Sequence, residues 1–153
     1  MNNILIAVDG SERSLEAAKK ALDLFESGNV DITIITILKE VESSVYDVPH
    51  GASSAMSAET MQDLRDQRKE EAKETGRKIV NEAASIFESL GKEVNRVILL
   101  GDPADEICDY AEENNIDMIV LADKGHGGVK RFLLGSISDK VVRHADTSVL
   151  VVK

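Results

Sequence analysis

Short, unbroken apolar runs alternate with amphipathic helical patterns along this chain, and this alternation restricts the possible folds more than any other feature. Residues 4–8 read Ile-Leu-Ile-Ala-Val and stop at Asp9-Gly10. A continuous apolar run of this length indicates a strand that is buried on both faces, as in a parallel sheet. Between residues 15 and 25 the apolar residues then recur at helical spacing, so a helix is expected to follow the first strand.

The same alternation continues to the last residue and predicts the order β-α-β-α-β-α-β-α-β. Helical crossovers between successive strands imply parallel pairing and right-handed connections. With 153 residues, the chain is expected to form one α/β domain over residues 1–153. The third strand begins with alternating apolar and polar residues, which suits an edge position. The later strands are expected at residues 32–38, 94–100, 118–121 and 149–152, and the later helices at residues 64–90, from Asp102 onward, and at residues 136–145.

Composition and charge exclude several classes of function. The net charge is −10, which argues against general binding to nucleic acid and against docking on anionic membranes. No apolar run approaches the length of a membrane span, and the run at residues 4–8 is too short and lacks the preceding basic residues of a signal peptide. A cytoplasmic protein is therefore expected. An anionic ligand would still bind where backbone N–H groups create a local positive field.

Cysteine and histidine offer little chemistry. Cys108 is the single cysteine, so an intrachain disulfide is impossible, and its helical surroundings favour a small buried hydrophobe over a reactive thiol. None of the three histidines pairs with another His or Cys at metal-ligand spacing. No metal site built from protein side chains alone is expected.

The glycine-rich stretch between residues 121 and 136 is the best candidate for a ligand site. It follows a buried strand and ends where a helix begins. Glycine lets a backbone approach a ligand closely, and the positive end of a helix favours an anion, most plausibly phosphate. The alternative is a flexible connection in which Ser136 and Asp139 form a capping box. The spacing alone leaves both interpretations open.

At this stretch the sequence resembles the universal stress proteins, whose usual motif is Gly-x-x-Gly, nine residues, and then Gly-Ser or Gly-Thr. Residues 122–125 read Ala-Asp-Lys-Gly, and nine residues separate them from Gly135-Ser136. Further similarities are Ile-Ala-Val-Asp-Gly-Ser at 6–11, Gly-Asp-Pro at 101–103 and the closing Val-Leu-Val-Val at 149–152. The order and spacing of these segments make the resemblance fairly specific, and it covers nearly the whole chain.

The resemblance implies a single-domain, Rossmann-like open sheet of five parallel strands in the order 3-2-1-4-5, with helices on both faces. Ligands of such sheets bind where the strand order reverses, outside the carboxyl ends of the strands. In this chain the crevice would lie between Asp9 and residues 122–128. The implied ligand is an adenine nucleotide, with ATP favoured over ADP, AMP or cyclic AMP, and with Mg²⁺ or Mn²⁺ held only through the phosphates.

The implied contacts divide by part of the nucleotide. Asp9 would accept a hydrogen bond from the ribose or adenine, and the main chain of Ile37 would meet the base. Residues 122–128 would wrap the ribose and phosphates, and the first turn of the following helix would bind the phosphates. The implied site residues are Ala7, Asp9, Ile37, Ala122, Asp123, Lys124, Gly125, His126, Gly127, Gly128, Gly135, Ser136, Ile137 and Ser138.

Two residues put this assignment in question. Ala122 stands where the motif has its first glycine. A positive φ there would strain an alanine by about 1 kcal/mol or more, whereas with a negative φ it would only crowd the ribose. Asp123 brings a negative charge close to the expected phosphates, which Lys124, His126, Lys130 and Arg131 could offset unless these charged side chains face water. Asp9 also has a simpler interpretation, as a turn or N-cap residue before the first helix.

Three functional hypotheses remain. The first is a stress-response regulatory protein that binds a nucleotide and hydrolyses it weakly at most, because no Gly-Lys-Ser/Thr P-loop is present and no general base or arginine finger is evident. The second is an interaction protein of the same fold that binds no nucleotide and works through its dimer and an unknown partner. The third is another doubly wound protein, a phospho-acceptor receiver or a flavodoxin, although the acidic cluster and hydroxyl-rich loop that these require are incomplete.

The last strand favours self-association. In the implied strand order it is an edge strand, and an exposed apolar edge invites uncontrolled pairing. Pairing with its copy in a two-fold dimer would remove this edge, and members of the family commonly dimerise through this strand. The expected interface residues are Val149, Leu150, Val151 and Val152.

Overall fold

Five parallel strands form one sheet in the order β3-β2-β1-β4-β5 in a computed structural model of the chain. The structure describes residues 3–25, 28–39, 58–125 and 134–153. The expected fold and strand order are confirmed, and β3 occupies an edge as its alternating pattern predicted. The strands are β1 (Asn3–Ala7), β2 (Asp31–Leu38), β3 (Val94–Leu100), β4 (Met118–Ala122) and β5 (Ser148–Val152).

Helices connect successive strands, and their starts follow recognisable signals. Asp102 is the N-cap of the helix that follows it, because its Oδ1 accepts hydrogen bonds from the amides of Ala104 (3.1 Å) and Asp105 (3.3 Å). The second helix begins at Ala58, before the predicted start at residue 64. Its first turns are polar, so the apolar pattern that indicates a helix is missing there. The helices are α1 (Glu12–Phe25), α2 (Ala58–Glu88), α3 (Pro103–Glu113) and α4 (Ser136–His144).

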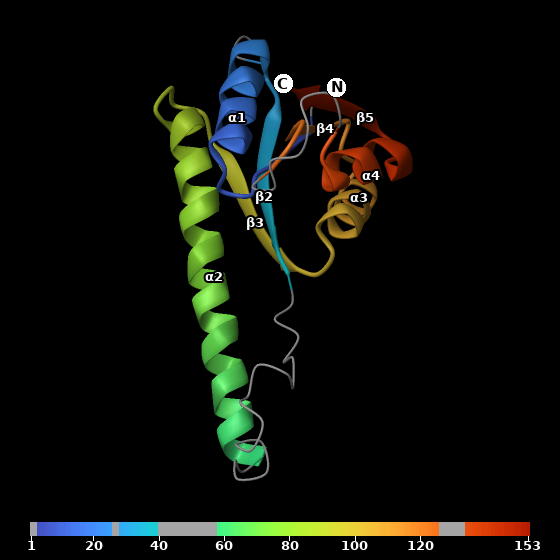
Figure 1. Cartoon of the computed structure of the whole chain (residues 1–153). Coiled ribbons are helices and arrows are strands. Elements are labelled where there is room, and N and C mark those ends of the chain that lie inside the picture. The colour runs from blue at the N-terminus through green and yellow to red at the C-terminus, as the bar shows by residue number, and fades with distance from the viewer. Residues whose placement is uncertain (1–2, 26–27, 40–57, 126–133) are drawn as a thin grey trace.

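The molecule has three layers, with α1 and α2 on one face of the sheet and α3 and α4 on the other (Figure 1). Alternate residues of β1 serve the two cores. Ile4 and Ile6 pack with α1 and α2, whereas Leu5 packs with α3 and α4, and all three are fully buried. This arrangement explains the unbroken apolar run in the sequence, since both faces of the strand are covered.

Helix α2 is longer than the sheet it covers, and its N-terminal half extends beyond the rest of the described structure (Figure 1). Arg68, which interrupts the apolar face of this helix, is exposed there. The buried side chains of this helix, including Val80 and Phe87, belong to its C-terminal half. No helix in the described ranges has the length and apolar character needed to cross a membrane.

The strand order determines where a ligand site can form. The chain leaves β1 toward β2 on one side, and β4 lies on the other side of β1. The connections that follow β1 and β4 therefore diverge to opposite faces of the sheet. A crevice at the carboxyl ends of these two strands is the expected consequence.

Candidate functional site

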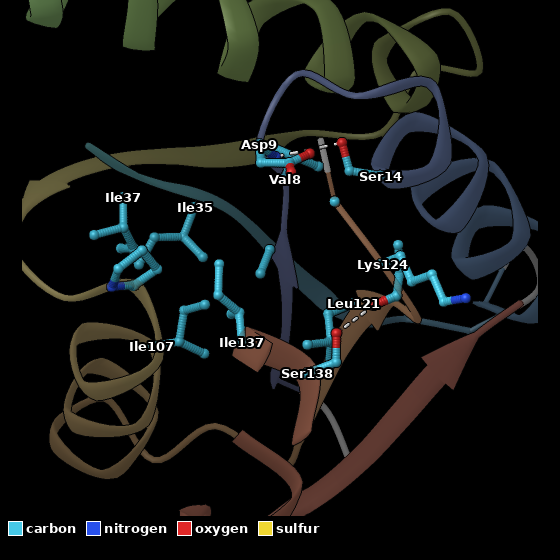
Figure 2. Close-up of a pocket in the computed structure, with 14 residues that line it drawn as sticks. Val8, Asp9, Ser14, Ile35, Ile37, Ile107, Leu121, Lys124, Ile137 and Ser138 are labelled. Atoms are coloured by element: carbon cyan, nitrogen blue, oxygen red, sulfur yellow. Dashed lines mark hydrogen bonds between the residues drawn. The ribbon is translucent and has the colours of Figure 1, made fainter. Parts of the chain in front are cut away.

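A cavity of about 90 Å³ lies at the carboxyl ends of β1, β2 and β4, beside the first turns of α3 and α4 (Figure 2). Eight of the residues predicted for the site line it, which means that the structure brings together residues from four distant parts of the chain. They are Ala7, Asp9, Ile37, Ala122, Lys124, Gly125, Ile137 and Ser138.

The cavity has an apolar side and a polar side. In Figure 2 the side chains of Ile35, Ile37, Ile107 and Ile137 gather together. Asp9, just after β1, and Ser14, in α1, lie apart from them. A mainly apolar slot with a few polar groups is typical of sites for small organic ligands. Sequence reasoning missed six lining residues, namely Val8, Ser14, Ile35, Pro103, Ile107 and Leu121.

Asp9 stabilises the turn after β1 and also lines the cavity. Its Oδ1 accepts hydrogen bonds from the Ser11 amide (3.0 Å) and the Ser11 hydroxyl (2.6 Å), so it stabilises the turn into α1. The N-cap is Ser11 rather than Asp9, because Ser11 Oγ accepts a hydrogen bond from the amide of Ser14 (3.2 Å). The other carboxylate oxygen, Oδ2, faces Gly125, where a Cβ atom would overlap it.

Ala122 occupies its motif position without backbone strain. It is the last residue of β4 and is 7% exposed. Asn115 is the single non-glycine residue of the described part of the chain with a positive φ, so Ala122 lies outside the left-handed region. Of the two consequences considered for the missing glycine, strain is therefore excluded, and what remains is a methyl group at the cavity wall.

Asp123 connects three elements and does not line the cavity. Its amide donates to the carbonyl of Val152 (2.7 Å), and its carbonyl accepts from the amide of Gly135 (2.7 Å) and from the hydroxyl of Ser138 (3.1 Å). Its side chain, 13% exposed, forms an ion pair with Arg13 across 2.6 Å. The negative charge that the sequence brings close to the expected ligand is thus paired with a cation from α1.

The structure excludes the capping box of Ser136 and Asp139 that the sequence left open as an alternative. Helix α4 begins at Ser136, and the N-cap is Gly135, which has no side chain to form a cap bond. A Cβ atom at Gly135 would lie 3.2 Å from the carbonyl oxygen of Asp123 and 3.3 Å from the Cα of Lys124. The close approach of these two segments favours glycine at this point. The helix starts at Ser136, one residue before the start that a capping box with Ser136 as N-cap would require.

The start of α4 offers backbone donors beside the cavity. The amides of Ser136, Ile137 and Ser138 stand at the first three positions of the helix, where no intrahelical acceptor exists, and the helix dipole adds a partial positive charge. The Ser138 hydroxyl also contacts the carbonyl oxygen of Ala122 (2.8 Å, dashed in Figure 2). Its hydrogen is therefore used within the protein, and the backbone amides are the donors that remain for a ligand.

Of the other predicted residues in the stretch after β4, the structure describes Lys124 but not His126, Gly127 or Gly128. Lys124 is 9% exposed, and in Figure 2 its ammonium group points away from Ile35 and Ile37. His126, Gly127 and Gly128 lie outside the described residues, as does the segment 40–57. Across the described ranges, no three His, Cys, Asp or Glu side chains gather in a way that would hold a metal ion.

The fold and the cavity define an open α/β protein with a candidate ligand site at the topological switch point between β1 and β4. The chain belongs to the universal stress protein family, whose sequence profile matches residues 1–153. A universal stress protein of Methanocaldococcus jannaschii is 33% identical over 150 residues, which are 98% of this chain and 81% of that protein.

Solved structures share the fold over the full chain. UspA of Lactobacillus plantarum is 26% identical, with a TM-score of 0.69 and coverage of 99% of this chain and 97% of that one. A universal stress protein in complex with cAMP is 22% identical (TM-score 0.69, coverage 99% and 97%). The Archaeoglobus fulgidus protein in complex with dAMP is 20% identical (TM-score 0.62, coverage 100% and 98%). An Arabidopsis thaliana family protein with AMP bound is 18% identical (TM-score 0.64, coverage 100% and 91%).

Proposed function

We propose that this chain is a stress-response regulatory protein that binds an adenine nucleotide, ATP foremost, at the switch point between β1 and β4. The observation that carries the proposal is the cavity there, which is lined by Asp9, Gly125 and the first turn of α4. The bound adenine nucleotides of the cAMP, dAMP and AMP complexes in the same fold support it.

The proposed orientation of the nucleotide follows from the polarity of the cavity. The base would occupy the apolar slot between Ile37 and Ile107, where burial of its ring is favourable. The slot of about 90 Å³ is smaller than the roughly 300–1,000 Å³ of a typical ligand site. The ribose and phosphates would therefore extend from it toward Gly125 and the amides at the start of α4, where an anion is stabilised.

Asp9 would accept a hydrogen bond from the ribose or the base, since its carboxylate lies at the cavity. The methyl group of Ala122 would lie against the ribose. Any Mg²⁺ or Mn²⁺ would enter with the phosphates. We propose regulation rather than turnover, because the sequence has no P-loop lysine for the phosphates; ligand binding would instead shift the population of protein conformations that a partner recognises.

The test begins with the purified protein, which is denatured so that any released nucleotide can be identified by chromatography and mass. Calorimetry with ATP and Mg²⁺ then compares the native chain with Asp9→Asn and with the control Asp23→Asn, an exposed aspartate of α1. A loss of about tenfold is expected for Asp9→Asn and none for the control. An empty protein that gains no thermal stability from millimolar ATP and Mg²⁺ would overturn the proposal and favour the interaction protein that binds no nucleotide.

We also propose that the chain forms a two-fold homodimer through β5. This strand ends the sheet, and its central residues Val149, Leu150 and Val151 are only half-buried. An apolar edge of this kind is stabilised by pairing with a second copy. Light scattering at tens of micromolar is expected to give twice the mass of one chain, and Leu150→Lys is expected to halve it. The control Leu24→Lys, at a 63% exposed position of α1, should leave the mass unchanged. A monomeric native chain would overturn the proposal.

A further inference from the structure

We propose that Arg13 positions residues 122–125 and sets the preference of the site for charged ligands, through its ion pair with Asp123. The positioning role stands on the described contacts alone. The effect on ligands rests on the proposed nucleotide site.

Asp123 is placed where it controls the geometry of the cavity wall. Its amide is bonded to Val152 at the end of β5, and its carbonyl accepts hydrogen bonds from Gly135 and Ser138 at the start of α4. A shift of Asp123 would therefore move both the end of β4 and the helix that carries the proposed phosphate donors. Only its side chain reaches toward α1, where Arg13 holds it at 2.6 Å.

Arg13 contacts Asp123 from α1. It belongs to the first turn of α1, directly after the turn that Asp9 and Ser11 stabilise. The ion pair thus joins the β1–α1 connection to the β4–α4 connection, as does the contact of Asp9 with Gly125. Two contacts from the same turn therefore hold residues 122–125 against the carboxyl end of β1.

The electrostatic consequence depends on the exposure of the two side chains. Arg13 is 53% exposed, whereas Asp123 is 13% exposed and lies between two cavity-lining residues, Ala122 and Lys124. Without Arg13, a poorly hydrated carboxylate would remain beside the ligand site of a chain whose net charge is already −10. Because Coulomb repulsion scales with the ligand charge, the affinity for ATP should fall most and the affinity for adenosine least.

The test uses Arg13→Met, which keeps an unbranched side chain and removes the positive charge. The variant should fold, because an exposed ion pair contributes little to stability. Calorimetry is expected to show a loss of about fivefold to tenfold for ATP, smaller losses for ADP and AMP, and none for adenosine. Adding Asp123→Asn to Arg13→Met removes the unpaired charge and should restore ATP binding, and Arg13→Lys should retain most of it. Arg96→Met is the matched control, since Arg96 pairs with Glu88 far from the cavity at 2.5 Å.

A second measurement needs no ligand. Hydrogen exchange at the amides of Asp123 and Gly135 is expected to accelerate about threefold to tenfold in Arg13→Met, with no change at the Glu106 amide, which donates to Asp102 in α3. Unchanged exchange at Asp123 and Gly135 would overturn the positioning role. Equal losses for adenosine and ATP, or no loss for either, would overturn the charge role. Failure of the native chain to bind any of the four ligands would overturn the proposed nucleotide site and the charge role with it, and the exchange result would still decide the positioning role.

Discussion

Asp9 and Gly125 touch so closely that a Cβ atom at Gly125 would overlap Oδ2 of the Asp9 carboxylate. Asp9 lies in the connection that follows β1, and Gly125 lies in the connection that follows β4. Both residues line the cavity. The φ of Gly125 is not positive, so the requirement for glycine at this position comes from the neighbouring carboxylate and not from the backbone conformation.

The first prediction concerns Gly125→Ala. The added methyl group must displace the Asp9 carboxylate, which loses its hydrogen bonds to Ser11. Overpacking of this kind costs about 1–3 kcal/mol, and the displaced carboxylate can no longer meet a ligand. We expect a lower unfolding midpoint and at least a tenfold weaker binding of ATP, measured by urea unfolding and calorimetry.

Gly28→Ala is the control for this substitution, because the nearest atom to its added Cβ would be Val30 Cγ1 at an ordinary contact distance of 3.4 Å. Gly28→Ala should leave the urea unfolding midpoint and the affinity for ATP nearly unchanged. Native-like stability and ATP affinity in Gly125→Ala would show that Asp9 can move aside without cost, and the interpretation of this contact would then be wrong.

The second prediction concerns Gly76, which lies within α2 where the helix crosses the sheet. A Cβ there would lie 2.8 Å from Ile98 Cγ2 and 3.1 Å from Leu38 Cδ1. Alanine improves helix propensity by about 1 kcal/mol, but overpacking against these side chains costs about 1–3 kcal/mol. We expect Gly76→Ala to lower the free energy of unfolding by about 1 kcal/mol, measured with urea.

Thr75→Ala provides the comparison, since Thr75 is exposed on the adjacent position of the same helix. It should be neutral or slightly stabilising. A Gly76→Ala variant that is more stable than the native chain would mean that α2 can move away from β2 and β3 freely, which would contradict close packing at this point.

The fold was predictable from the sequence because its strands are buried on both faces. A strand that is covered on both faces, such as β1, gives an unbroken apolar run in the sequence, here at residues 4–8. The polar first half of α2 lacked such a signal, and its start was predicted too late. The strand order came from the resemblance to a family, since periodicity alone does not say which strands are neighbours.

The candidate site was predictable only in part. Residues that follow strand ends in polar or glycine-rich segments, such as Asp9 and Gly125, stand out in the sequence. An apolar residue that lines a cavity, such as Ile107, has the same pattern as one in the core. The pair of Arg13 and Asp123 joins residues 110 positions apart, and no local pattern contains it.

The third prediction concerns pH. Lys140 of α4 contacts Asp102 (3.1 Å) and Asp105 (2.8 Å) at the start of α3. The hydrogen bond from Lys140 lowers the pKa of Asp102 below its ordinary value of 3.8. The hydrogen bond to Asp105, followed by that to Asp102, raises the pKa of Lys140 above 10.5.

The pKa shifts of Asp102 and Lys140 make stability depend on pH at opposite ends of the pH range. The contribution of Asp102 to stability is complete above its ordinary pKa of 3.8 and is lost as the pH falls through the lowered pKa. The contribution of Lys140 is complete below 10.5 and is lost as the pH rises through the raised pKa. Lys140→Met should therefore make folding stability less sensitive to both acidic and alkaline pH.

Thermal unfolding between about pH 2 and pH 7 tests the acid side of this prediction. Asp102→Asn is the informative companion, because its amide oxygen still caps α3 while the charge is gone. Arg143→Met, which removes the exposed pair with Asp139, is the control. Equal acid sensitivity of the native chain and Lys140→Met would contradict the assignment of the effect to this cluster.

The last prediction concerns Cys108, which is half-buried on α3. Burial raises the pKa of its thiol above the ordinary value of 9.0, and the carboxylates of Asp109 and Asp105 raise it further. The thiolate is the reactive form of cysteine, so less of it exists at pH 7 than for a free thiol. We expect alkylation by iodoacetamide at pH 7 to be slower than for glutathione. The rate should rise with pH and should reach that of a free thiol in concentrated urea, where burial is lost. A folded protein that reacts as fast as glutathione at pH 7 would identify Cys108 as a reactive thiol and not as a small hydrophobe of the α3 core.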